Sequence, residues 1–199
     1  MRPPTVIIFC KAPRFGTVKT RLAQGVGKAQ ALRFYRATLG ATIRRACGIP
    51  GCETVLCVTP DHATTARDLG PGTMPAVPQG RGDLGQRMAR ALDRFRDRDR
   101  ILVGGDIPGI RRHHLRQALA LTRRNDVVFG PATDGGFWLV GLRRGVQPPG
   151  LFRDVRWSRP QTLDDCLHRL PATAWRVGMA SRLNDVDDLE DYRRQMNRR

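Results

Sequence analysis

The feature that most constrains this chain is a regular alternation of short apolar runs with longer helix-like stretches. The run Thr5–Cys10 is continuous, β-branched and aromatic, which is the pattern of a strand buried on both faces. The stretch Ala29–Ala46, small and apolar with arginines along its outer side, then predicts a helix, and Glu53–Thr59 predicts the next strand. An alternating order of this kind favours an α/β protein whose mostly parallel sheet has helices on both faces.

The rest of the sequence continues the alternation without a repeat or an interdomain linker. Asp61 is expected to cap a short helix that reaches Leu69. Further helices are expected at Leu84–Phe95, Leu115–Thr122, Gln161–Leu170 and from about Asp187. Further strands are expected near Met74–Val77 and at Ile101–Val103, Asp126–Gly130, Phe137–Leu142 and Ala174–Val177. For a length of 199 residues we expect one domain over 1–199.

Apolar runs in the sequence are short. None approaches the roughly 20 residues of a membrane span, and the longest early run, Val6–Cys10, is too short for the core of a secretory signal. The cysteines form no CxxC pair and have no histidine pair nearby, so we expect reduced, buried thiols at Cys10, Cys47, Cys52, Cys57 and Cys166. These features predict a soluble, cytoplasmic protein.

The net charge of +17 arises from 35 lysines and arginines against 18 aspartates and glutamates. Only three of the 35 are lysines, and glutamate is nearly absent beside aspartate. One interpretation is a nucleic-acid-binding module without catalysis. The other is a compositional bias toward arginine and aspartate, with an incidental preference for anions. Aromatic residues make up only 6% of the chain, which favours the second interpretation because single strands are bound by stacking on surface aromatics.

The segment Lys11–Leu22 follows the first predicted strand and opens a helix. Phosphates bind at this position in α/β folds, because the helix N–H groups and the helix dipole favour anions. Lys11, Lys19 and Arg21 supply positive charge, and Gly16 lets the backbone approach a ligand closely. The segment has neither the GxxxxGK[ST] spacing of a Walker loop nor the GxGxxG of dinucleotide-binding folds. We therefore predict a phosphate-binding loop of another kind.

Two acidic motifs stand out in so basic a chain. Asp106 follows two glycines at the carboxyl end of a predicted core strand, where a carboxylate can hold Mg²⁺ together with substrate phosphates. Asp185 and Asp187 belong to an acidic cluster, Asn184–Asp191. Ordinary structure would also explain both motifs, as a capped turn and as a helix start enriched in acids. The residues alone leave both interpretations open.

Two glycine-rich loops fit the walls of a ligand pocket. Asp134 lies in Gly130–Trp138, between two predicted strands, which is typical of either a plain hairpin or a shaped pocket wall. Gln79–Arg87 is a polar loop that enters a helix and is suited to contacting a base or a sugar. Trp157 belongs to a polar-aromatic cluster before the predicted helix at Gln161. No Ser-His-Asp or Cys-His arrangement is evident, so we do not expect nucleophilic catalysis.

Six ordered motifs in the sequence resemble those of the GT-A superfamily of nucleotide-diphospho-sugar transferases. They cover nearly the whole chain, at Phe9–Leu22, Gln79–Met88, Gly104–Pro108, Gly130–Leu142, Trp157–Ser158 and Asp185–Asp191. The chain is most similar to a bacterial branch of small, radical-SAM-associated glycosyltransferase-like proteins, which resemble molybdenum-cofactor and 2-phospholactate guanylyltransferases. The resemblance implies a three-layer α/β/α sandwich with a mostly parallel mixed sheet of the GT-A type.

The resemblance also implies a transferase that depends on Mg²⁺ or Mn²⁺. Its substrates would be a nucleoside triphosphate or an NDP-sugar and an unknown acceptor, with nucleotidyl transfer preferred over glycosyl transfer. The implied catalytic residues are Lys19, Arg21 and Asp106, and the implied metal ligands are Asp106 and Asp187, with Asp185 as the rival of Asp187. The implied nucleotide-binding residues are Lys11, Pro13, Gly16, Lys19, Thr20, Arg21, Gln79, Gly82 and Asp83. The implied acceptor pocket comprises Asp134, Gly135, Gly136 and Trp157.

Overall fold

The strands of this computed structural model form one seven-stranded sheet in the order β3-β2-β1-β4-β6-β5-β7. The structure describes residues 2–65, 74–184 and 186–196. β6 pairs antiparallel with both of its neighbours, and every other pairing is parallel. The strands are β1 (Thr5–Lys11), β2 (Glu53–Thr59), β3 (Ala76–Pro78), β4 (Arg100–Gly104), β5 (Val127–Pro131), β6 (Phe137–Leu142) and β7 (Val177–Met179). The predicted mostly parallel mixed sheet is therefore confirmed.

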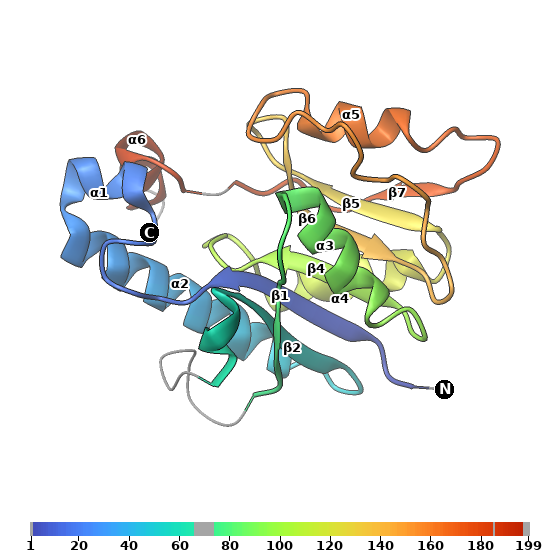
Figure 1. The fold of residues 1–199 in the computed structure, drawn as a ribbon, viewed down its shortest axis with the longest axis horizontal. Helices are drawn as coiled ribbons and strands as arrows, with labels where there is room; N and C mark the ends of the chain where they lie inside the picture. Colours follow the sequence, from blue (N-terminus) through green and yellow to red (C-terminus); the bar gives the residue numbers. More distant parts are fainter. Residues whose placement is uncertain (1, 66–73, 185, 197–199) are drawn as a thin grey trace.

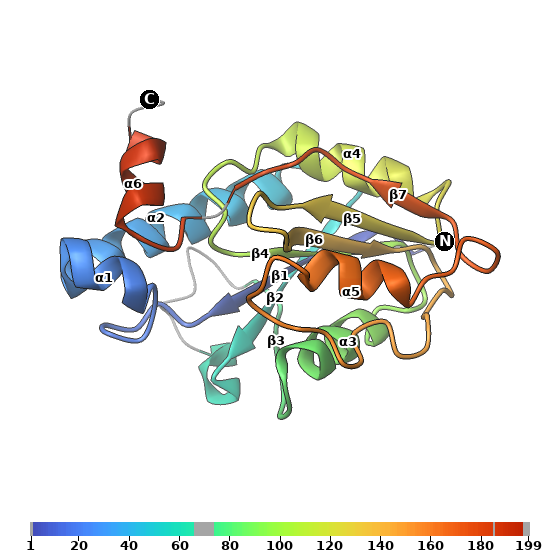
Figure 2. The ribbon, with the colours of Figure 1, turned by 90° about the horizontal axis from the view of Figure 1, so that it is seen from above.

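Helices cover both faces of the sheet, as Figure 2 shows in the view along its edge. α2 (Lys28–Cys47) and α4 (Arg112–Thr122) pack on one face, and α3 (Leu84–Asp93) and α5 (Thr162–His168) pack on the other. Two further helices, α1 (Thr20–Val26) and α6 (Leu189–Met196), lie together beyond one end of the sheet (Figure 1). The three-layer α/β/α sandwich is thus confirmed.

The core follows from the two-residue period of the strands. In β1, Val6 and Ile8 are buried with the α2 and α4 side, and Ile7 between them is buried with the α3 and α5 side. Because successive side chains of a strand point to opposite faces, a strand between two helical layers has to be apolar throughout. This explains why Thr5–Cys10 is an unbroken apolar run rather than an alternating one.

Several elements differ from the sequence expectation at their ends. The region after β1 contains a separate helix, α1, because Gly27 takes a φ of 80° and breaks the chain direction before α2. β7 lies two to three residues later than the expected Ala174–Val177. The helix after Asp61 is the 3-10 helix η1 (Asp61–Thr65), and its predicted extension toward Leu69 lies outside the described residues.

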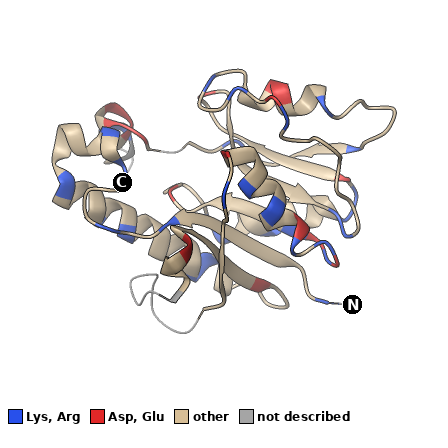
Figure 3. Cartoon of the chain, in the orientation of Figure 1, with Lys and Arg blue, Asp and Glu red and all other residues tan. Residues whose placement is uncertain are grey.

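The charged residues are spread widely over the molecule. Lys and Arg occur on helices and loops all around the fold rather than along a single element (Figure 3). All five cysteines are free; Cys10, Cys57 and Cys166 are buried as expected, whereas Cys47 is exposed and Cys52 half-buried. None of the described helices is both long and apolar enough to cross a membrane.

Candidate active site

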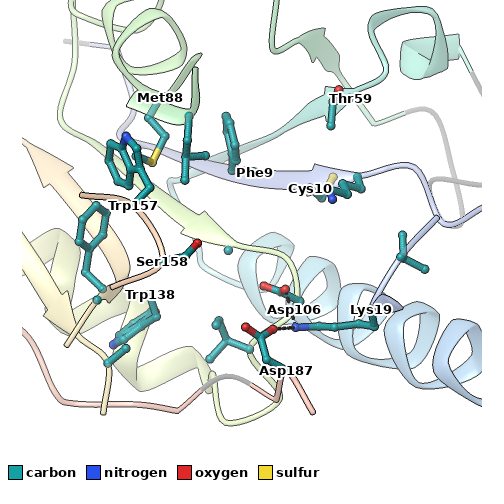
Figure 4. Close-up of a pocket in the computed structure, with 18 of the residues that line it drawn as sticks. Phe9, Cys10, Lys19, Thr59, Met88, Asp106, Trp138, Trp157, Ser158 and Asp187 are labelled. Carbon is teal, nitrogen blue, oxygen red and sulfur yellow. Dashed lines mark hydrogen bonds and ion pairs between the residues drawn. The ribbon is translucent and has the colours of Figure 1, made fainter. Parts of the chain in front are cut away.

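Three charged side chains from distant parts of the chain meet at the carboxyl edge of the sheet. The Lys19 ammonium lies 2.7 Å from Asp106 Oδ2 and 2.7 Å from Asp187 Oδ1. Figure 4 shows the two carboxylates converging on this nitrogen. The structure therefore brings together one residue each from the basic loop, the turn after β4 and the late acidic motif.

Lys19 is held in an unusual conformation. Its backbone has φ 47° and ψ 49°, the left-handed region that side chains other than glycine rarely adopt. Strain of this kind costs on the order of 1–3 kcal/mol and persists only where the surroundings impose it. The side chain is only 4% exposed. Burial alone would lower the pKa of Lys19, but the two carboxylates outweigh it and raise that pKa above its ordinary value. Lys19 is thus a fixed cation.

Asp106 reaches the cluster because two glycines precede it, Gly104 at the end of β4 and Gly105 just beyond the strand. The Gly105 N–H donates to the Phe9 carbonyl at 3.1 Å, which continues the pairing with β1 past the end of the strand. A side chain on Gly105 would approach Cys10 and Leu39 to 2.9 Å, so only glycine fits this close passage. The backbone then turns and presents the Asp106 carboxylate, which is 36% exposed, to the cavity.

Asp187 reaches the cluster through the packing of α6. Tyr192 of α6 stacks edge-on against Phe34 of α2, with ring centroids 5.3 Å apart, and accepts a hydrogen bond from Gln30 at 3.0 Å. Two neighbouring acids of this motif have different partners. Asp188 accepts hydrogen bonds from backbone N–H groups of the first turn of α6, whereas Asp187 forms the ion pair with Lys19. Asp185, the rival metal ligand, lies outside the described residues.

A cavity of about 530 Å³ extends from this cluster across the edge of the sheet. One end, here called the cationic end, is bordered by the ends of β1 and β2, the start of α1 and one side of α3. Its polar and charged lining residues are Lys11, Lys19, Thr20, Arg21, Thr59, Gln79, Arg87, Asp106 and Asp187. Lys11 and Arg21 are exposed, so their charges are available to a ligand. The cationic end can therefore receive a polyanion such as a phosphate chain.

The other predicted nucleotide-binding residues shape the walls rather than line the cavity. Pro13 and Gly16 lie in the loop between β1 and α1, and neither borders the cavity. Asp83 caps α3, accepting from the Gln86 backbone at 2.8 Å while the Gln86 side chain accepts from the Asp83 backbone in return. Gly82, with a φ of 106°, closes the turn before this cap.

Gln79 is both a cavity residue and a structural clamp. Its side-chain amide is buried and donates to the carbonyls of Cys10 and Cys57, at 3.0 and 3.1 Å. Its oxygen accepts from Arg87 at 3.0 Å. Gln79 thereby joins the ends of β1 and β2 and fixes the Arg87 guanidinium at the cationic end. The sequence predicted Gln79 as a ligand contact and placed Arg87 at the end of the same polar loop, but gave Arg87 no role of its own.

Tyr35 is a second cavity residue that the sequence did not single out. Its hydroxyl donates to the Lys11 carbonyl at 2.9 Å and accepts from the Lys11 N–H at 2.9 Å, so it fixes the start of the basic loop. Burial raises the pKa of the Tyr35 hydroxyl. Burial likewise raises the pKa of the nearby Cys10 thiol to about 12, which leaves it protonated and a poor nucleophile.

The opposite end of the cavity, here called the aromatic end, is built by the β5–β6 loop, β6 and the loop before α5. It is lined by Ala132, Asp134, Gly136, Phe137, Trp138, Trp157, Ser158 and Thr162. The rings of Phe137 and Trp157 are half-buried, with centroids 6.3 Å apart. In Figure 4, Trp157 and Trp138 lie on the side of the cavity away from Lys19. Trp138 is buried, yet it still borders the cavity.

Gly135 and Asp134 fix the shape of the aromatic end. Gly135 has a φ of 85°, and a Cβ there would overlap the Pro160 carbonyl. Its own carbonyl accepts from the Leu163 N–H at 3.0 Å, which ties the β5–β6 loop to α5. Asp134 Oδ1 accepts from the Gly136 N–H at 2.9 Å. Of the four predicted acceptor-pocket residues, all but Gly135 line the cavity.

The convergence of two carboxylates in the ion cluster fits the binding of a small divalent cation. Two carboxylates already converge on one point, and that point holds a cation, the Lys19 ammonium. Within the described ranges, no three His, Cys, Asp or Glu side chains group closely enough to form a complete protein cage for a metal. Mg²⁺ characteristically binds one or two carboxylates and completes its shell with water and substrate phosphates. The donor set therefore suits a metal that arrives with a phosphorylated ligand.

Comparison with protein families finds a matching model. Residues 42–159 match the family described as "Uncharacterized protein conserved in bacteria (DUF2064)". The match runs from within α2 to the loop before α5 and includes Gln79, Asp106, Asp134 and Trp157. It covers more than half of the chain.

The sequence is also similar to part of a protein with a named activity. Phosphoenolpyruvate guanylyltransferase of Mycolicibacterium vanbaalenii is 33% identical over 116 residues, which is 55% of this chain and 54% of that protein. The chain thus spans about half the length of that relative.

Among solved structures, a protein of Desulfovibrio desulfuricans described as a nucleotide-diphospho-sugar transferase superposes with a TM-score of 0.87 at 29% identity, over 96% of this chain and 85% of its own. The manganese complex of Rv0371c from Mycobacterium tuberculosis superposes with a TM-score of 0.56 at 17% identity, over 98% of each chain. The fold is that of the nucleotide-diphospho-sugar transferases, as the motifs predicted.

Proposed function

This chain belongs to the DUF2064 family. Because its ion cluster lies beside a cavity that is lined by cations at one end, we propose that it is a nucleotidyltransferase. The observation that carries the proposal is the Lys19 ammonium fixed between Asp106 and Asp187 at the carboxyl edge of the sheet. Ligands of open α/β sheets bind at this edge. The partial relative named as a guanylyltransferase supports the same class of reaction.

The substrate in this proposal is a nucleoside triphosphate bound at the cationic end. Lys11, Lys19 and Arg21 face its phosphates, with Thr20 beside them at the first position of α1. Pro13 and Gly16 hold the shape of the loop. Gln79 faces the base or the sugar, and Gly82 and Asp83 shape the turn behind it without lining the cavity. The residues supply position and charge rather than a covalent intermediate.

The transfer itself is a displacement at the α-phosphorus. An acceptor oxygen forms a bond to that phosphorus, the bond to the bridging oxygen breaks, and pyrophosphate leaves with the electron pair. Lys19 and Arg21 offset the negative charge that develops on the phosphate oxygens. Asp106 and Asp187 would hold Mg²⁺ or Mn²⁺, which when bound polarises the phosphoryl oxygens as a Lewis acid. The acceptor lies at the aromatic end, against Asp134, Gly136 and Trp157, while Gly135 holds the shape of the loop that carries them.

Glycosyl transfer from an NDP-sugar is the second candidate. The observation that favours it is the structural match at a TM-score of 0.87 to a protein described as a nucleotide-diphospho-sugar transferase. In that reaction the acceptor oxygen attacks the anomeric carbon, and the nucleoside diphosphate leaves. The same cationic end would bind the diphosphate.

A ligand panel separates these candidates. We expect thermal stabilisation by at least one of GTP, ATP, CTP and UTP, larger with Mg²⁺ than without it, because a ligand that binds only the folded state raises the melting temperature. Release of pyrophosphate on addition of an acceptor mixture would then identify nucleotidyl transfer. Stabilisation by NDP-sugars alone would favour glycosyl transfer. If neither a nucleoside triphosphate nor an NDP-sugar shifts the melting temperature, with or without Mg²⁺, the result would contradict both nucleotidyl and glycosyl transfer.

A further inference from the structure

The aromatic end of the cavity differs from the cationic end in its charge. None of the described residues that line the aromatic end is a lysine or an arginine, and its only ionisable side chain is the carboxylate of Asp134. This is notable in a chain with 35 cationic residues and a net charge of +17. The four cations among the described lining residues, Lys11, Lys19, Arg21 and Arg87, all belong to the cationic end.

The nearest arginines along the chain do not change this picture. Arg156 precedes Trp157 but points to α5, where its guanidinium lies 2.6 Å from Asp165 Oδ1. Arg159 follows Ser158, is exposed, and does not line the cavity. Arg87 also borders the cavity, but its guanidinium is bound to Gln79 beside β1 and β2. An anion at the aromatic end would therefore lose its hydration without meeting a cation.

The aromatic end offers ring faces instead. Phe137 packs against Trp157, and both are backed by Phe152, whose ring centroid lies 6.4 Å from that of Phe137 and 6.1 Å from that of Trp157. Trp157 also lies over Gly85 of α3, where any side chain would collide with the indole. Rings fixed in this way present an apolar wall with little entropy left to lose on binding. Such a wall recognises another apolar or aromatic face.

We infer that the acceptor of this enzyme is an uncharged hydroxyl compound with an apolar or aromatic face, rather than a phosphorylated or carboxylic acid. The inference rests on the proposed function, because it assigns the aromatic end to the acceptor. A hydroxyl acceptor also carries a proton that must leave as its oxygen bonds to the α-phosphorus. Asp134 lines this end with one carboxylate oxygen bound to the Gly136 N–H, and its other oxygen accepts that proton.

Calorimetric titration with two probes tests this inference. The first is 4-nitrophenyl β-D-glucopyranoside, a neutral aryl compound with hydroxyls. The second is phosphoenolpyruvate, which carries a phosphate and a carboxylate. Each is titrated into the full chain with Mg²⁺, once alone and once with the nucleotide selected by the ligand panel, supplied as its α,β-methylene analogue. Nucleotide affinity is measured in the same experiment, so that a failure of the proposed function is recognised separately from a failure of this inference.

We expect the glucoside to bind the nucleotide-loaded wild-type protein at least about tenfold more tightly than phosphoenolpyruvate, because stacking on an aromatic face contributes about one to two decades of affinity. Trp157→Leu should weaken glucoside binding about tenfold and leave nucleotide affinity unchanged within about twofold. Trp175→Leu, at a tryptophan that does not line the cavity, is the matched control and should change neither. Phe137→Leu tests the same wall if Trp157→Leu does not fold.

Two results would overturn the inference. One is tighter binding of phosphoenolpyruvate than of the glucoside to wild-type protein loaded with the nucleotide analogue, in which the cationic end is already occupied. The other is a loss of nucleotide affinity in Trp157→Leu and Phe137→Leu with glucoside binding unchanged, which would place the base of the nucleotide on these rings.

Discussion

At the scale of single residues, Lys19 unites the observations about the site. It combines a left-handed backbone, a nearly buried ammonium and two ion pairs of 2.7 Å. The sequence indicated each participant from its place after a strand or before a helix. It could not indicate that the lysine would hold the two acids together, because this contact joins positions 168 residues apart. Tyr35 was missed for a related reason, since its partners are backbone groups of Lys11, which have no sequence signature.

Replacing Lys19 by Met should separate its two roles. The change removes a phosphate contact, so we expect nucleotide affinity to fall about 10- to 100-fold, the worth of a charged hydrogen bond. It also leaves Asp106 and Asp187 without their shared cation, so Mg²⁺ alone should raise the melting temperature more than it does in the wild type. Lys19→Arg retains the charge and serves as the control. Unchanged nucleotide affinity in Lys19→Met would remove Lys19 from the phosphate site.

The ion pair between Arg156 and Asp165 should be visible in the titration of one carboxyl. Hydrogen bonds from the Arg156 guanidinium and backbone hold the pKa of Asp165 at about 2, below the ordinary value of 3.8. A carboxyl whose pKa is lowered by folding adds stability above about pH 4, and this stability is lost as the pH falls toward 2.

Arg156→Ala should therefore move the pKa of Asp165 up toward 3.8, as measured by carbon NMR of the side-chain carboxyl. Arg159→Ala, at the next exposed arginine, should leave that pKa in place. A pKa that stays at about 2 in Arg156→Ala would show that other groups set it.

At the scale of elements, the order of strands and helices was predictable, while the ends and the connections were not. Periodicity and β-branched runs located β1, β2, β4, β5 and β6 because these strands are buried on both faces. β7 has three residues and one buried position, too little for a pattern. The separation of α1 from α2 depends on the positive φ of Gly27, which the sequence shows only as a glycine between Val26 and Lys28.

The β5–β6 loop provides a test of how tightly this element is built. Gly135→Ala introduces both an unfavourable φ and an overlap with the Pro160 carbonyl. Gly145→Ala is its matched control, because Gly145 has a similar φ of 77° and no described neighbour within 4 Å of the position that a Cβ would take.

We expect Gly145→Ala to cost about 1 kcal/mol in the free energy of unfolding, from backbone strain alone. Gly135→Ala should cost about 2 kcal/mol more, since the loop or Pro160 has to move. Urea denaturation measures both. An equal loss of unfolding free energy in the two variants would mean that the β5–β6 loop accommodates the added Cβ without a further cost.

At the scale of the whole molecule, the positions of the cations are more informative about the ligand than the net charge of +17. Most arginines lie along helices and loops throughout the fold (Figure 3), while the cations that line the cavity gather at one end beside the two acids. A cavity of about 530 Å³ suits a small ligand rather than a polymer. The general excess of positive charge attracts anions without selecting among them.

This distribution predicts weak and salt-sensitive binding of nucleic acid. Random-sequence DNA should bind at low salt and lose most of its affinity by about 150 mM salt, because each phosphate contact releases counterions. Nucleotide with Mg²⁺ should retain its affinity far better over the same range. Gel-shift and calorimetric titrations at matched salt compare the two. DNA binding that stays tight at physiological salt would instead favour the nucleic-acid-binding module.

The central claim is that Asp106, Asp187 and Lys19 form a site for a nucleotide and a divalent cation. Calorimetric titration of the nucleoside triphosphate selected by the ligand panel, with and without Mg²⁺, tests it most directly. We expect Mg²⁺ to strengthen binding to the wild type and to the exposed control Asp164→Asn about equally. In Asp106→Asn and Asp187→Asn we expect the Mg²⁺ effect to fall by about tenfold or more, the loss typical of removing a charged contact. An identical Mg²⁺ effect in all four proteins would contradict the claim.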